Sequence, residues 1–198
     1  MILGGHAIIS AYGFWLPNDP RGSWSDFVRS WELFRYGAAT KVNTRESVAH
    51  AEHNAALRAA AKSALRYPPV VMSGRQALCV GQGFGRIVKT TGRVVHACAI
   101  LPDHVHLVIR RHRYAMEQVL NLLKGGATRE LTGQGPHPLK THADCNGKPP
   151  CPWARRFWLV YIDDHEHLGR AIRYVEDNPL KEGKHRQRWS LVSPYEGR

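Results

Sequence analysis

Two histidines one residue apart are the side chains of this sequence best suited to chemistry. His104 and His106 lie in an apolar run that is typical of a buried strand. Side chains alternate across a strand, so both imidazoles face one side, while Val105, Leu107 and Ile109 face a core. Neutral imidazole is a common ligand of divalent transition metals, but two ligands do not complete a site. The pair therefore predicts part of a metal site, and a pair of structural histidines is the alternative.

A second pair of candidate groups, a phenol and a carboxamide, lies further along the chain on a helix predicted over residues 165–178. Tyr174 and Asn178 are four residues apart and share a helix face, with Arg170 one turn earlier on that face. A phenol can act as a nucleophile in phosphoryl transfer, and an amide oxygen can bind a cation. A partly buried tyrosine and a helix C-cap are the ordinary alternatives for Tyr174 and Asn178.

The pattern of apolar residues predicts the elements that must position these groups. We expect strands over residues 6–12, 94–101, 104–111 and 153–162. We expect helices over residues 44–66 (capped by Asn43 or Thr44), 74–88 (capped by Ser73), 114–131, and 165–178 (capped by Asp163 or Asp164 and closed by Pro179). This order matches an α+β, ferredoxin-like sandwich, with an antiparallel sheet, helices on one face and an insertion after the first strand.

Length and composition favour one domain over residues 1–198. Within it, residues 17–72 form the expected insertion, and the Pro/Gly-rich residues 133–152 form a loop without regular structure. The formal charge of +12 and a pI near 10 favour nucleic acid as the partner. The first residues lack the pattern of a signal peptide and no window is apolar enough to span a membrane, so we expect a cytoplasmic protein with four reduced cysteines.

The stretch PDHVHLVI, followed about seventy residues later by RYVEDNPLKEG, resembles the single-tyrosine HUH transposases. This family includes the transposases of the smallest bacterial insertion sequences and the REP-associated tyrosine transposases. Its signature is a histidine, a hydrophobic residue and a histidine on a strand, then a catalytic tyrosine with an amide residue four positions later. AYGFWLPNDPRGSW and LKGGATREL also resemble family segments, and the resemblance covers most of residues 6–14 and 93–184.

The resemblance implies a metal-dependent endonuclease and strand transferase that acts on single-stranded DNA beside a hairpin. Tyr174 would form a 5′-phosphotyrosine link, and His104, His106 and Asn178 would hold Mg²⁺ or Mn²⁺. Family members act as homodimers or alone, and the sequence leaves both open. The target DNA, the cut site and the choice between a mobile-element and a host role also stay open.

Basic residues are the candidates for contact with DNA phosphates. They are Arg110, Arg111, Lys124, Arg129, Arg170, Arg173, Lys181 and Lys184. Solvated surface charge is the alternative for each of them. Trp153, Trp158 and Trp189 are candidates for base stacking, although tryptophan is more often part of a core.

Several rival interpretations belong beside this one. Asp103 stands where the family commonly has asparagine, and it either tunes the metal or begins the turn. His165 and His167 share the H-x-H spacing but sit at a helix start, where they do not share a face. Zinc bound by His137, His142, Cys145 and Cys151 is a weak alternative because the spacing is irregular. A noncatalytic binder of single-stranded or hairpin DNA, and a phosphodiesterase that uses water in place of Tyr174, are the rival functions.

Overall fold

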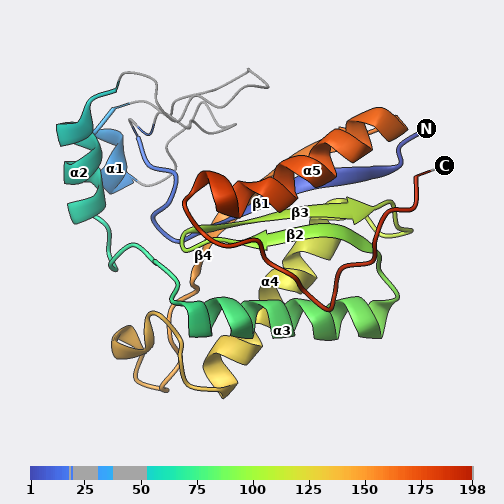
Figure 1. Cartoon of the computed structure of the whole chain (residues 1–198). Helices are drawn as coiled ribbons and strands as arrows, with labels where there is room; N and C mark the ends of the chain where they lie inside the picture. The colour runs from blue at the N-terminus through green and yellow to red at the C-terminus, as the bar shows by residue number, and fades with distance from the viewer. Residues whose placement is uncertain (18, 20–30, 38–52, 198) are drawn as a thin grey trace.

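The computed structural model of the chain describes residues 1–17, 19, 31–37 and 53–197, and these form a sheet with helices on both faces (Figure 1). The sheet has the order β2-β3-β1-β4, with every neighbouring pair antiparallel. Its strands are β1 (Gly4–Ala11), β2 (Val95–Ile100), β3 (His104–Arg110) and β4 (Trp153–Ile162). The helices are α1 (Trp31–Phe34), α2 (Ala55–Ser63), α3 (Gly74–Thr91), α4 (Met116–Gly133), α5 (His165–Lys181) and the short 3-10 helix η1 (Lys140–His142). The predicted α+β class, with an antiparallel sheet of ferredoxin-like order, is confirmed.

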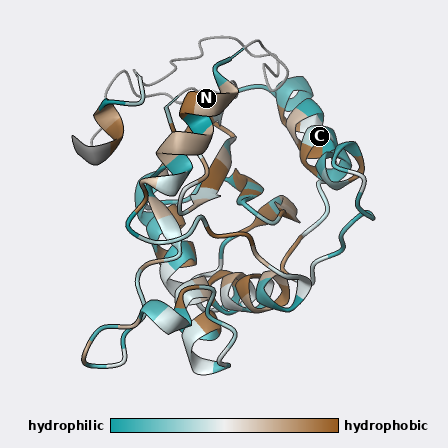
Figure 2. Ribbon diagram, turned by 90° about the vertical axis from the view of Figure 1, so that its left-hand side faces the viewer, coloured by the Kyte–Doolittle hydropathy of each residue, from teal (hydrophilic) through white to brown (hydrophobic). Residues whose placement is uncertain are grey.

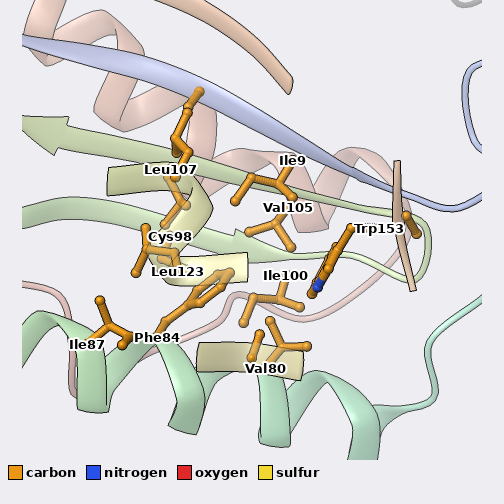
Figure 3. Packing of buried hydrophobic residues seen from close by; sticks show 14 of the residues in the cluster. Ile9, Val80, Phe84, Ile87, Cys98, Ile100, Val105, Leu107, Leu123 and Trp153 are labelled. Carbon is orange, nitrogen blue, oxygen red and sulfur yellow. The ribbon is translucent and has the colours of Figure 1, made fainter. Parts of the chain in front are cut away.

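One face of the sheet builds the main core against α3 and α4. Val105 and Leu107 of β3 pack there with Phe84 of α3 and Leu123 of α4, all of them fully or almost fully buried (Figure 3). Removing side chains of this size from water stabilises the fold by about 1.5–3 kcal/mol each. Because β3 alternates, this packing turns the histidines of the strand to the other face, as predicted.

Helix α5 covers that other face. Its apolar residues Leu168, Ala171 and Val175 pack on Ala99 and Val108 of the sheet. The expectation that the helices lie on one face was therefore wrong for α5. An amphipathic sequence indicates that a helix has an apolar side, but the face that it covers depends on how the chain crosses the sheet.

Helices α3 and α4 cross at very short range. A Cβ atom added to Gly83 would lie 2.6 Å from the backbone of Ala127, so only glycine allows this approach. Helix α3 begins with the predicted cap: Ser73 accepts from the amide of Gln76, and the Gln76 side chain accepts from the amide of Ser73. Both helices are amphipathic, with one side buried. Figure 2 shows hydrophobic (brown) and hydrophilic (teal) residues following one another along the helical ribbons of the molecule.

Most element ends shift by one to three residues, and three segments differ from the predictions in kind. The helix expected over residues 44–66 appears only as α2, capped by Asn54; residues 53 and 54 are not helical, and the cap proposed at 43 or 44 lies outside the described residues. The 133–152 loop contains η1, and α4 extends to Gly133. Pro179 does not close α5, which continues to Lys181. The proline removes one amide donor, and the last turn is held because the amides of Gly183 and Lys184 bond to the carbonyls of Leu180 and Pro179.

The segment after α5 returns along the sheet edge that β2 would otherwise present. The Gln187 side chain accepts from the amide of Ile100 at 2.8 Å and donates to its carbonyl at 2.7 Å. Further on, Val192 forms a parallel bridge with Val95, and the ring of Trp189 lies against Gly81 of α3.

All four cysteines are free thiols, as predicted. None of the helices in the described ranges combines the length and apolarity needed to cross a membrane.

Two alanine substitutions on α3 test the close crossing with α4. Gly83→Ala should lower the free energy of unfolding by roughly 1–3 kcal/mol because the added methyl group meets backbone. Gly85→Ala should raise it by up to about 1 kcal/mol, since its Cβ would find its nearest neighbour only 3.9 Å away. Urea unfolding followed by circular dichroism gives both values. A stabilising effect at both positions would show that helix propensity, and not close contact, decides the outcome at Gly83.

Candidate active site

The two histidines of β3 converge on one point between the sheet and α5. His104 and His106 are 7% and 3% exposed, and their Nε2 atoms lie 3.0 Å apart. Two ligands on adjacent positions of an octahedral cation with bonds near 2.1 Å are also about 3 Å apart. The predicted pairing of the two imidazoles therefore has the spacing that one shared cation requires.

Asp103 and Phe14 hold the first of these rings. The Oδ1 atom of Asp103 lies 2.7 Å from Nδ1 of His104, and the Phe14 ring stacks on the imidazole with centroids 4.8 Å apart. A carboxylate that accepts the Nδ1 proton leaves Nε2 with a free lone pair, as in carboxylate–histidine–metal arrangements. Of the two roles considered for Asp103, this geometry favours orientation of the metal ligand.

A third histidine, His6 of β1, holds the second ring and was missed in the sequence. Its Nε2 lies 3.1 Å from Nδ1 of His106. Either ring can donate in this contact, so His6 can fix the orientation of His106 whether or not Nε2 of His106 binds a cation. The pairing of β1 with β3 brings these residues together, and neither strand reveals that pairing in its own sequence.

Burial keeps both of these histidines neutral. Desolvation, and then the charge of His167, lowers the pKa of His6 to about 4. Desolvation, followed by the charges of His104, His6 and Lys181, lowers the pKa of His106 well below its ordinary value. Neutral imidazole is the form that binds metals, so His106 is a competent ligand at neutral pH.

Ser10 adds a further sign that a polar ligand fits beside His104. Ser10 of β1 lies directly opposite His104 in the strand register, and its buried hydroxyl has no hydrogen-bond partner. A buried hydroxyl in this state costs about 1–3 kcal/mol. A hydrated divalent cation between the histidines would offer Ser10 a partner, so the donor set fits such an ion.

Tyr174 of α5 lies against the same histidines within the same chain. Its ring centroid is 5.6 Å from that of His106 and 5.7 Å from that of His6, edge-on in both cases. The side chain of Asn178 hydrogen-bonds to the Tyr174 hydroxyl, and Lys181 Nζ lies 4.4 Å from the ring centroid. Burial raises the pKa of Tyr174, the Asn178 bond lowers it, and Glu182 raises it. The structure thus brings His104, His106 and Tyr174 together, with Asn178 beside Tyr174 on the same helix face. Asn178 is not the C-cap, which is Glu182.

The predicted DNA-contacting residues divide into two groups. Those exposed on the β3 end and on or after α5 are Arg110, Arg111, Arg170, Arg173, Lys181 and Lys184, with Arg170 paired to Glu166. Lys124 and Arg129 are instead on α4, across the sheet from the histidines. Lys124 donates to the carbonyls of Ala154 and Arg155, and Arg129 lines a cavity between α3 and α4. The spacing of apolar residues on this helix predicts that Lys124 and Arg129 point away from its apolar side. It does not indicate which face of the sheet the helix covers.

The structure also distinguishes among the tryptophans and among the other candidate metal ligands. Trp153 is buried in the core and Trp189 lies against Gly81, whereas Trp158 meets His6 edge-on at 5.1 Å. Stacking on a base therefore remains a hypothesis for Trp158 alone.

Among the described residues, one group of three His, Cys, Asp or Glu side chains lies close enough to hold one ion. It consists of Asp163, Asp164 and His167, so the four candidate zinc ligands do not meet. Asp164 already caps α5, as predicted.

Substitution of Asp103 tests where a divalent cation binds. Asp103→Ala should weaken Mn²⁺ binding by about 10- to 100-fold because His104 loses its orienting acceptor. Asp103→Asn keeps an acceptor oxygen and should have a much smaller effect. Isothermal titration of the metal-free protein measures the affinity, with Asp163→Ala as the control. Loss of binding in Asp163→Ala, with Asp103→Ala unaffected, would place the ion at the start of α5.

Comparisons with known proteins identify the family to which this chain belongs. The family model described as "Transposase IS200 like" matches residues 69–178, a range that contains both histidines of β3 and ends at Asn178. A REP-associated tyrosine transposase bound to a REP hairpin is 11% identical with a TM-score of 0.47, over 91% of this chain and 68% of that one. A putative transposase from Deinococcus radiodurans is 13% identical with a TM-score of 0.45, over 94% of each chain. A search of curated proteins finds no match. The family model covers more than half of the 198 residues, and the chain therefore belongs to the IS200-like transposase family.

Proposed function

We propose that the protein cleaves and rejoins single-stranded DNA near a hairpin through a 5′-phosphotyrosine intermediate. The observation that carries the proposal is that Tyr174 lies against His106 in its own chain, with Asn178 bonded to its hydroxyl. Membership of a transposase family and a formal charge of +12 support DNA as the substrate. Because nucleophile and candidate ligands occur in one chain, we also propose that a single copy can perform the cleavage.

In the first step, the Tyr174 oxygen attacks a backbone phosphorus and the bond from phosphorus to the 3′ oxygen breaks. The phenol loses a proton and the departing 3′ oxygen gains one, so the number of phosphate ester bonds is unchanged. A 3′-hydroxyl of another strand can reverse the step, which permits joining without a nucleotide cofactor. Trp158, which contacts His6 edge-on, would stack on a base of the bound strand.

The residues around Tyr174 act on its proton and its position. Burial and the charge of Glu182 raise the pKa of Tyr174 and so disfavour the phenolate, whereas the hydrogen bond from Asn178 favours it. His104, His106 and Asn178 would hold Mg²⁺ or Mn²⁺, with imidazole ligands favouring Mn²⁺. When bound, that ion would supply charge neutralisation for the phosphate and the leaving oxygen. Asp103 and His6 keep the two imidazoles in place throughout.

Tyr174→Phe should abolish the covalent adduct and leave DNA binding nearly unchanged, because only the attacking oxygen is removed. The assay incubates protein, Mn²⁺ and a single-stranded hairpin oligonucleotide, followed by denaturing electrophoresis. A label at the 3′ end should stay with the protein, and a label at the 5′ end should leave on a fragment with a free 3′-hydroxyl. Chelation of the metal should also abolish the adduct.

Tyr195→Phe is the matched control, since Tyr195 contacts His96 and His165, away from the candidate metal ligands. Metal-dependent cleavage that persists in Tyr174→Phe would identify water as the nucleophile. Binding without any adduct, across a broad set of oligonucleotides, would identify a noncatalytic DNA-binding protein.

A further inference from the structure

Ser10 is a polar residue at a position where packing alone would favour an apolar one. Its side chain is fully buried, and its hydroxyl has no hydrogen-bond partner among the described residues. The adjacent strand residues Ile9 and Ala11 are apolar and equally buried. Alanine at this position would avoid the cost of a buried hydroxyl without a partner. The serine is therefore unexplained by the stability of the sheet.

The register of the sheet places Ser10 beside one candidate metal ligand. Ser10 of β1 stands opposite His104 of β3, and residues opposite each other on antiparallel strands project from the same face. This is the face on the side of α5 (Figure 1). On the other side of β1, the register with β4 shifts between Ile9 and Ala11, as at a β-bulge. Bulges redirect side chains and are frequent beside active sites.

The length of the Ser10 side chain limits how it can take part in cation binding. Its oxygen is bonded directly to Cβ, whereas Nε2 lies at the far end of a histidine ring. The Nε2 atoms of His104 and His106 lie 3.0 Å apart, so a cation bound by both would lie closer to the ring tips than to this hydroxyl. A water molecule on such a cation can bridge the difference, because a hydroxyl accepts hydrogen bonds as well as donating them.

We propose that Ser10 holds a water molecule of the cation bound by His104 and His106, and thereby favours Mn²⁺ or Mg²⁺ over Zn²⁺. The proposal rests on the cation site of the proposed function. Imidazole ligands alone bind Zn²⁺ more tightly than Mn²⁺, so they do not provide this preference. Mg²⁺ and Mn²⁺ take octahedral shells, in which Mg²⁺ keeps several waters, whereas Zn²⁺ is usually four-coordinate. A hydrogen bond to a bound water therefore stabilises the more hydrated ions more strongly.

Ser10→Ala should have opposite effects on the metal-free protein and on Mn²⁺ binding. The metal-free variant should unfold at a higher temperature than the parent protein, because a buried hydroxyl without a partner is removed. Its affinity for Mn²⁺ should fall by about tenfold, as for other residues that support a metal site from outside the ligand shell. Its affinity for Zn²⁺ should change much less. Isothermal titration of the chelator-treated full chain with each metal alone gives both affinities.

The water on bound Mn²⁺ provides a readout that packing alone would not change. Its exchange, followed by the relaxation of water oxygen nuclei, should become faster in Ser10→Ala because one bound water loses its protein partner. Thr128→Val is the matched control, since the Thr128 hydroxyl donates to the carbonyl of Lys124 and accepts from Nε1 of Trp153. This variant should unfold at a lower temperature and keep the parent affinities for both metals.

Two results in Ser10→Ala would overturn the proposal. Unchanged Mn²⁺ affinity would mean that the hydroxyl binds ordinary water, and an equal loss for Mn²⁺ and Zn²⁺ would mean that Ser10 acts only on the position of His104. Failure of the parent protein to bind Mn²⁺ would overturn it as well. These titrations contain no DNA, whereas adduct formation by Tyr174 requires it. Absence of the adduct with an intact preference for Mn²⁺ would therefore contradict the proposed cleavage and leave the role of Ser10 standing.

Discussion

The line of polar contacts from Asp103 through His104 and His106 to His6 is the interaction on which the rest of the site depends. Each ring is held at its Nδ1 atom, by a carboxylate at one end and by an imidazole at the other. The two Nε2 atoms are thereby left facing each other at 3.0 Å. Strand β3 alone fixes the direction of the two rings, but their rotation comes from the neighbouring turn and from β1.

Burial of these polar groups requires a cover, and α5 provides it. The helix packs on β2 and β3 through its apolar residues, and this packing determines where its polar residues lie. Tyr174 is still 39% exposed at the edge of the cover, so a substrate can approach its oxygen. One helix therefore covers the histidines and places Tyr174, the proposed nucleophile, beside them.

Local features of the sequence were predictable because they depend on neighbouring residues. The strand over 153–162, the Ser73 cap and the common face of His104 and His106 follow from alternation or capping chemistry. His6 could not be found in this way, because its role depends on the pairing of strands about one hundred residues apart. The position of α5 and the inward partners of Lys124 likewise depend on how distant segments pack.

The C-terminal segment has a consequence for how copies of this protein can meet. The free edge of a sheet offers unpaired amides and carbonyls to any extended chain, including a strand of a second copy. Here Gln187 engages both backbone groups of Ile100, and Val192 bridges to Val95 further along. On the opposite edge strand, Lys124 occupies two carbonyls of β4. Strand-to-strand growth between molecules is thus blocked along much of the β2 edge and at the start of β4, and a chain shortened before Gln187 would regain an adhesive edge at β2.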